Sequence, residues 1–102
     1  MKAKTTRSIQ KIRGILLTNK QDLSDHYGVR EIGIFGSYAR NEHKKNSDID
    51  ILIELEKPIG FFKFIRLERH LSVLLGVKVD LVTKGALKPY IGQHILTEVI
   101  YV

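Results

Sequence analysis

Cysteine is absent from this chain of 102 residues, so disulfide bonds and thiolate metal sites are excluded. No apolar run approaches the roughly 20 residues that a membrane-spanning helix needs, and we expect no contact with a membrane. The basic N-terminal segment lacks an uninterrupted apolar stretch and does not predict a signal peptide. Together these absences predict a soluble intracellular protein of the cytoplasm.

Histidine is sparse, and the four histidines show no metal-ligand spacing. We interpret each of them as a surface residue or a histidine with satisfied hydrogen bonds. The sequence also contains no internal repeat, no low-complexity tract and no linker rich in proline or glycine. We therefore expect one domain over residues 1–102, which is long enough for a single modest core.

Positive charge is concentrated in the first half of the chain. The net charge is +6, and residues 1–46 carry ten Lys and Arg against four Asp and Glu, whereas residues 47–102 carry seven of each kind. Two interpretations remain open: the basic half attracts a polyanion, or it is a solvated helix face. Nucleic acid is not favoured as a direct substrate, because no reader motif and no interleaved aromatic residues accompany the charge.

Hydrophobic spacing predicts a small α/β (α+β) domain in which helices pack on one β-sheet. The strand directions are not determined, and the pair around the polar segment 37–46 is antiparallel or part of a mixed sheet. The predicted elements are helices from about Thr6 to His26 and from Pro58 to near Gly76, strands over 30–36, 47–56 and 77–82, one helical turn and an exposed loop over 37–46, and a short helix followed by a strand in the tail.

Two carboxylates lie at the head of the strand predicted over 47–56. Residues at positions i and i+2 of a strand point the same way, about 7 Å apart, so Asp48 and Asp50 share one face. Their neighbours Ile49, Ile51, Ile53 and Leu55 form the other face. Two unpaired carboxylates repel each other, and burial adds a further cost unless a cation compensates. Mg²⁺, which prefers carboxylate oxygens, is a suitable cation.

Asp80 supplies a third carboxylate in the later strand. It alternates with Val79 and Leu81, and on a neighbouring strand it would face the same way as Asp48 and Asp50. Three carboxylates can hold two metal ions about 4 Å apart, the arrangement that suits in-line displacement at phosphorus.

The Gly36-Ser37 pair predicts a phosphate site. Gly36 has no β-carbon, so phosphate oxygens can approach its backbone closely. If Ser37 caps the helical turn behind it, the free N–H groups there form an anion site. Arg40, one turn later, is placed to reach a phosphate or to brace the aspartates.

These residues resemble the nucleotidyltransferase superfamily that shares a polymerase-β-like core. The shared pattern is Gly36-Ser37, a spacer of ten residues, Asp48-Ile49-Asp50 and a later Asp80. The segments GSYAR and SDIDILIEL most closely resemble the minimal nucleotidyltransferases, known as MNT proteins or MntA-like antitoxins, and the resemblance extends over nearly the whole chain. Asn41 departs from the glycine that is common at this place, but asparagine tolerates left-handed backbone angles.

The resemblance implies a function and a partner. Such proteins are paired with a HEPN-domain toxin that resembles an RNase, and they silence it by transferring AMP from ATP to one of its tyrosines. Carried over to this sequence, Asp48, Asp50 and Asp80 bind two Mg²⁺ ions, and Asp80 also serves as the base. The implied nucleotide-binding residues are Gly36, Ser37, Arg40 and Ser47.

An alternative function is a non-catalytic antitoxin that blocks its HEPN partner by binding alone. The apolar tail has two interpretations, a surface for such binding or, favoured for most of it, part of the core. The oligomeric state stays open, with a homo-oligomer and a hetero-oligomer with the toxin as the candidates. The tail residues are Tyr90, Ile91, Ile95, Val99, Ile100 and Tyr101.

Overall fold

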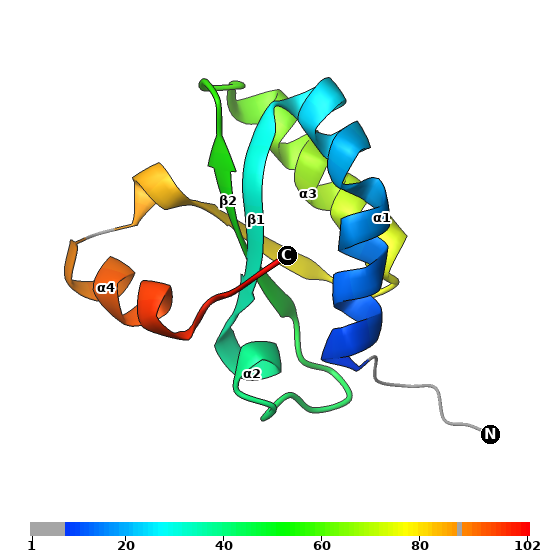
Figure 1. The fold of residues 1–102 in the computed structure, drawn as a ribbon, viewed down its shortest axis with the longest axis vertical. Helices are drawn as coiled ribbons and strands as arrows, with labels where there is room; N and C mark the ends of the chain where they lie inside the picture. The colour runs from blue at the N-terminus through cyan, green and yellow to red at the C-terminus, as the bar shows by residue number, and fades with distance from the viewer. Residues whose placement is uncertain (1–7, 88) are drawn as a thin grey trace.

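The computed structural model describes residues 8–87 and 89–102, without the side chains of residues 88–91. The fold is drawn in Figure 1. The strands of the described residues form one sheet in the order β3-β2-β1-β4, which confirms the predicted fold class. In the described part of the chain no helix is long and apolar enough to cross a membrane. The elements are α1 (Ile9–Tyr27), β1 (Val29–Phe35), α2 (Gly36–Ala39), β2 (Ile49–Leu55), α3 (Phe61–Leu75), β3 (Val79–Thr83), the 3-10 turn η1 (Lys84–Ala86), α4 (Pro89–Glu98) and β4 (Ile100–Tyr101).

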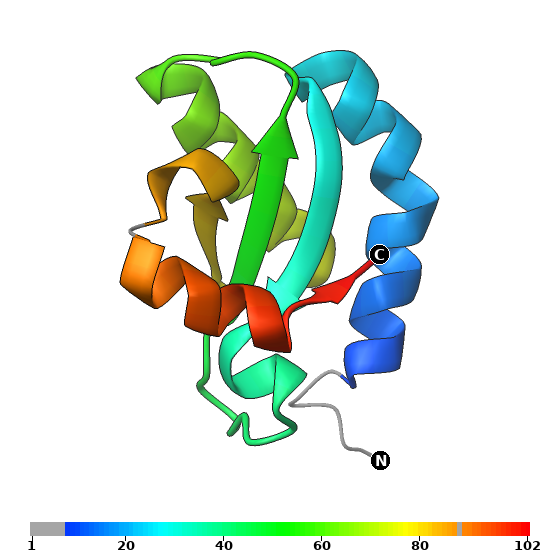
Figure 2. The ribbon, with the colours of Figure 1, turned by 60° about the vertical axis from the view of Figure 1, so that its left-hand side comes forward.

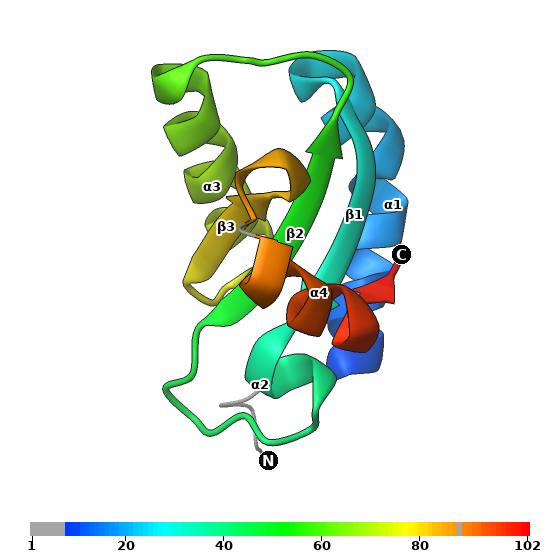
Figure 3. The same ribbon diagram turned by 90° about the vertical axis from the view of Figure 1, so that its left-hand side faces the viewer.

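The two long helices cover one face of the sheet. Figures 2 and 3 show α1 and α3 behind the strands, whereas α4 crosses the opposite face near the end where β2 begins. The core lies between the sheet and the two long helices, and the alternation predicted for β2 is confirmed there, because Ile49, Ile51 and Ile53 are completely buried. Burial of one such side chain contributes about 1.5–3 kcal/mol. The helix residues buried against them are Ile12, Leu16, Leu23, Leu67, Leu71 and Leu75.

The sheet is mixed. Strand β1 runs antiparallel to both β2 and β4, and β2 runs parallel to β3. In this register Phe35 at the end of β1 lies opposite Asp50, and Asp50 lies beside Asp80. The end of β1 and the beginnings of β2 and β3 therefore meet at one edge, which is where the predicted site residues collect.

Helix α1 ends as the sequence predicts, with Gly28 at its C-cap, and begins at Ile9. The Ser8 hydroxyl accepts a hydrogen bond from the Lys11 N–H at 3.2 Å and caps the first turn. The helix ends before Gly28, whose φ of 71° is in the left-handed region that glycine adopts without strain. Thr6, where the predicted helix begins, lies outside the described residues.

Several predicted boundaries were wrong; β3, for example, begins at Val79 and not at Val77. The second long helix begins at Phe61 and not at Pro58, because Gly60 has a φ of 80° and interrupts the right-handed helical conformation. The carboxylate strand begins at Ile49, so Asp48 lies just before β2 and not within it.

Candidate active site

The three predicted carboxylates lie at the end of the sheet where β2 begins. Asp50 on β2 and Asp80 on β3 are register partners of parallel strands, and neighbouring strands lie about 4.8 Å apart. Asp48 directly precedes β2, two residues before Asp50. Asp48 and Asp80 are exposed, whereas Asp50 is partly buried. The structure thus brings together residues that are far apart in the sequence.

The electrostatic state of Asp50 reflects this crowding. Its pKa is raised from the ordinary value to about 6, mainly by burial and then by the negative charges of Asp80 and Asp48. The positive charge of Arg40 acts in the opposite direction, and Glu98 adds a smaller increase. Negative charge is therefore in excess around Asp50, and a bound cation would relieve it.

The donor atoms of this cluster fit Mg²⁺ in chemistry and charge. Asp48, Asp50 and Asp80 offer carboxylate oxygens, the ligands that Mg²⁺ prefers, and the negative charges of Asp80 and Asp48 contribute to the raised pKa of Asp50. Among the described residues, however, no three His, Cys, Asp or Glu side chains already lie close enough to form a metal site. The assignment of these three residues to the metal stays a prediction.

Gly36 links the phosphate motif to the carboxylates. Its φ is 74°, and a β-carbon added there would overlap Asp50 Oδ2. A glycine is therefore required at this position for two independent reasons, the backbone conformation and the contact with Asp50. The group that approaches Gly36 in this structure is the Asp50 carboxylate, and the predicted approach of a phosphate stays a prediction.

The predicted cap at Ser37 was wrong. Helix α2 begins at Gly36, its N-cap position is Phe35, and no side chain caps it. Ser37 lies inside this single turn because the chain already turns at Gly36. Its carbonyl oxygen accepts a hydrogen bond from the Glu42 N–H at 2.8 Å, which holds the loop that follows.

The loop after α2 keeps its turn without the glycine that the family commonly has. Asn41 adopts a φ of 58°, so the tolerance expected of asparagine is confirmed. At the other end of this loop the Ser47 hydroxyl accepts a hydrogen bond from the Lys44 N–H at 2.7 Å. Ser47 therefore closes the loop next to Asp48, and its predicted role in nucleotide binding stays a prediction.

Glu98, the last residue of α4, is a site residue that the sequence analysis missed. Its Oε2 accepts a hydrogen bond from the Gly36 N–H at 2.8 Å, and the two carboxylate oxygens accept from Arg40 Nη1 at 3.1 and 3.2 Å. The side chain is only 17% exposed. Hydrogen bonds to Glu42 and Glu98 raise the pKa of Arg40. No local motif marks Glu98, because its partners lie about 60 positions earlier in the chain.

The tail around Glu98 does not form one exposed apolar patch. Ile95, Val99 and Ile100 are partly buried, and Tyr101 is 41% exposed. The side chains of Tyr90 and Ile91, which belonged to the predicted binding surface, lie outside the described part of the chain.

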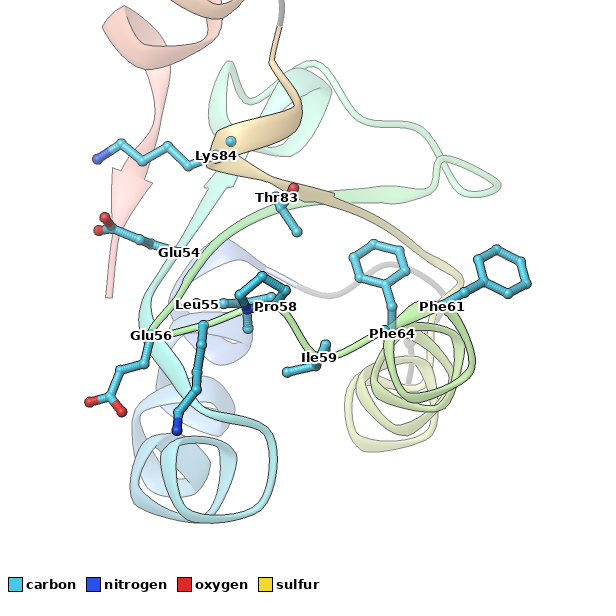
Figure 4. A pocket seen from close by; sticks show the side chains of 12 residues that line it. Glu54, Leu55, Glu56, Pro58, Ile59, Phe61, Phe64, Thr83 and Lys84 are labelled. Atoms are coloured by element: carbon cyan, nitrogen blue, oxygen red, sulfur yellow. The ribbon is translucent and has the colours of Figure 1, made fainter.

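A large cavity lies at the other end of β2, away from the carboxylates (Figure 4). It has a volume of about 700 Å³, and its apolar wall includes Ile59, Phe61 and Phe64. Glu54 on β2, Glu56 directly after β2 and Lys84 on η1 also line it. None of the predicted site residues lines this cavity, so it is distinct from the candidate active site.

Comparison with known proteins agrees with this geometry. The profile of the family described as nucleotidyltransferase domain matches residues 12–102. The chain belongs to this family. This nucleotidyltransferase is 48% identical over 95 residues to the protein adenylyltransferase MntA of Thermococcus cleftensis, with 93% of the chain and 96% of the relative covered. It is 52% identical over 97 residues to a Methanocaldococcus jannaschii protein assigned as a protein adenylyltransferase, with 94% and 99% covered.

Solved structures share the fold of this nucleotidyltransferase. A structure assigned as a minimal nucleotidyltransferase superposes with a TM-score of 0.80 at 30% identity, covering 95% of this chain and 98% of the other. A toxin–antitoxin structure with AMP-PNP superposes with a TM-score of 0.68 at 26% identity, covering 90% and 69%. The fold that the sequence resemblance implied is thereby confirmed.

Proposed function

We propose that this nucleotidyltransferase is the antitoxin of a toxin–antitoxin pair and transfers AMP from ATP to a tyrosine hydroxyl of a HEPN-domain toxin, in a Mg²⁺-dependent reaction in the cytoplasm. The observation that carries the proposal is the pairing of Asp50 with Asp80 on parallel strands, beside the Gly36 turn. A relative named protein adenylyltransferase and a toxin–antitoxin neighbour with AMP-PNP support it. The HEPN partner and the tyrosine acceptor rest on the sequence resemblance.

In this reaction the tyrosine oxygen attacks the α-phosphorus of ATP. A new P–O bond forms while the bond from the α-phosphorus to the bridging oxygen breaks, so that tyrosine carries AMP and pyrophosphate leaves. The hydroxyl proton passes to the carboxylate of Asp80, which is exposed to solvent. Mg²⁺ held by Asp48, Asp50 and Asp80 would neutralise the charge of the triphosphate.

The remaining residues position the nucleotide. The Gly36 N–H and the Arg40 guanidinium are hydrogen-bond donors that lie close together, because both donate to the Glu98 carboxylate. Donors of this kind hold phosphate oxygens and keep the leaving pyrophosphate in line with the attacking oxygen. Ser37 within α2 and Ser47 shortly before β2 add hydroxyl groups.

The direct test is labelling with ATP that carries a radioactive α-phosphate. The purified chain is incubated with Mg²⁺ and a HEPN-domain toxin, and we expect labelled toxin. Asp48→Asn and Asp50→Asn should abolish the label, because each removes a charged metal ligand at nearly constant size. Asp22→Asn, the same change on the exposed face of α1, is the matched control and should label normally.

Survival of cells that express the toxin separates catalysis from blocking by binding alone. A chain carrying both Asp48→Asn and Asp50→Asn should fail to protect the cells if AMP transfer is the protective event. Full protection by this inactive double variant would instead show that the antitoxin masks its partner, and the catalytic proposal would be wrong.

A further inference from the structure

We propose that the carboxylate of Glu98 occupies the place of a nucleotide phosphate, and that a bound triphosphate must displace it. Glu98 is thus a built-in competitor for the phosphate site. The inference rests on the proposed function in one respect, namely that the ligand is a nucleoside triphosphate. It goes beyond that function because it gives the C-terminal helix a part in controlling nucleotide affinity.

The contacts of Glu98 are those that a phosphate oxygen would make. The Gly36 N–H donates to Oε2 at 2.8 Å, and Arg40 Nη1 donates to both carboxylate oxygens at 3.1 and 3.2 Å. A backbone N–H next to a guanidinium is a donor set that carboxylate and phosphate oxygens share. The same two donors cannot serve a carboxylate and a phosphate at full strength at once.

Charge makes the two occupants mutually exclusive. The negative charge of Glu98 acts on Asp50, where Asp48 and Asp80 already contribute negative charge. A triphosphate that entered with Glu98 in place would bring further negative charge into a partly buried site, where Coulomb repulsion is only weakly screened. Release of Glu98 removes one of these charges and frees both donors.

The fold allows Glu98 to leave without unfolding the sheet. Glu98 is the last residue of α4, and its contacts with Gly36 and Arg40 are made by its side chain. The following strand β4 is held separately, through the register pairs of Tyr101 with Gly33 and of Ile100 with Ile34. A rotation of the Glu98 side chain therefore opens the phosphate site while β4 stays on β1.

The experiment measures ligand binding to the full chain by calorimetry in the presence of Mg²⁺. Glu98→Gln keeps the size of the side chain and removes its charge, so we expect ATP to bind about tenfold more tightly than to the natural chain. The affinity for inorganic tripolyphosphate should increase by the same factor, because Glu98 competes only with the phosphate groups. The matched control is Glu56→Gln at the far end of β2, which makes the same charge change on an exposed residue and should leave both affinities unchanged.

Equal or weaker binding of ATP and tripolyphosphate by Glu98→Gln would overturn the inference, since Glu98 would then support the site and not compete for it. If the natural chain itself binds no ATP, the proposed function fails, and the inference fails with it. Thermal unfolding verifies that Glu98→Gln is folded. If it is not, Glu98→Ala, which removes the acceptor altogether, must show the same gain in affinity.

Discussion

The carboxylate of Asp50 packs directly against Gly36, at the place where a β-carbon of residue 36 would stand. The two residues belong to different sequence motifs, the turn after β1 and the acidic strand β2. Antiparallel pairing joins them, because Phe35 at the end of β1 lies opposite Asp50. The phosphate motif and the metal motif are therefore in direct contact. A substitution in either motif should alter the position of the other.

Gly36→Ala should damage both stability and binding. The new methyl group displaces the Asp50 carboxylate and also forces alanine into a left-handed conformation, which alone costs about 1–2 kcal/mol. We expect urea denaturation to show a free energy of unfolding lower by about 2 kcal/mol or more, and calorimetry to show no ATP binding.

Gly14→Ala is the matched control for this change. A β-carbon at position 14 in α1 meets nothing within 4 Å, so this variant should be more stable by about 0.5–1 kcal/mol. If Gly36→Ala were as stable as the natural chain, the Asp50 carboxylate would not pack closely enough against Gly36 to exclude a β-carbon.

Asp50→Asn should stabilise the fold at neutral pH while it removes activity. Folding raises the pKa of Asp50 from its ordinary value near 4 to about 6, so the folded chain binds this proton more tightly than the unfolded chain. The free energy of unfolding therefore falls as the pH rises from about 4 to about 6, and the loss persists above that range. The shift in pKa sets an upper limit of about 3 kcal/mol on this loss in the free energy of unfolding. Solvent screening of the partly exposed carboxylate reduces the expected loss to about 1 kcal/mol.

Urea denaturation of both proteins at about pH 4 and about pH 7.5 checks this prediction. The variant should match the natural chain in acid, where Asp50 is protonated, and exceed its stability at the higher pH. A stability difference that does not change with pH would contradict the assigned state of Asp50.

Mg²⁺ with ATP should stabilise the natural chain against heat. A ligand at 100 times its dissociation constant adds about 2.7 kcal/mol, which corresponds to a rise of several degrees in Tm for a domain of this size. Asp80→Asn should reduce this rise, because it removes one of the three carboxylates at the site, whereas Asp22→Asn should keep it. An undiminished rise in Asp80→Asn would remove Asp80 from the ligand set.

Gly33→Ala should loosen the C-terminal strand. A β-carbon at position 33 would lie 2.6 Å from Val99 Cγ2 and 3.2 Å from the Ile100 carbonyl oxygen, so β4 must move away from β1. The Val102 N–H, which donates to the Ile32 carbonyl oxygen at 2.9 Å, reports this movement. We expect its hydrogen exchange to accelerate by at least about tenfold, equivalent to 1.4 kcal/mol of lost protection. Unchanged exchange would show that the sheet absorbs the methyl group without moving β4.

Patterns that repeat within one element were sufficient to predict most of the fold. The isoleucine alternation of β2 and the spacing of Leu67 and Leu71 in α3 follow from the geometry of a strand and of a helix, and the structure confirms both. Boundaries that depend on a single backbone angle were missed. Hydrophobic spacing predicts a start of α3 at Pro58, because this spacing carries no information about the backbone conformation of Gly60.

The sequence by itself determined the family, the sheet-forming segments and the identity of the three carboxylates, since each of these depends on residues that are neighbours in the chain or recur at a fixed spacing. Only the tertiary structure decided that Asp50 packs against Gly36 and that Glu98 holds the Gly36 N–H and Arg40. The physical reason is that these contacts depend on strand register and on the path of α4 across the sheet. The strand register and the path of α4 are set by packing between distant segments, and no repeating pattern in the sequence indicates them.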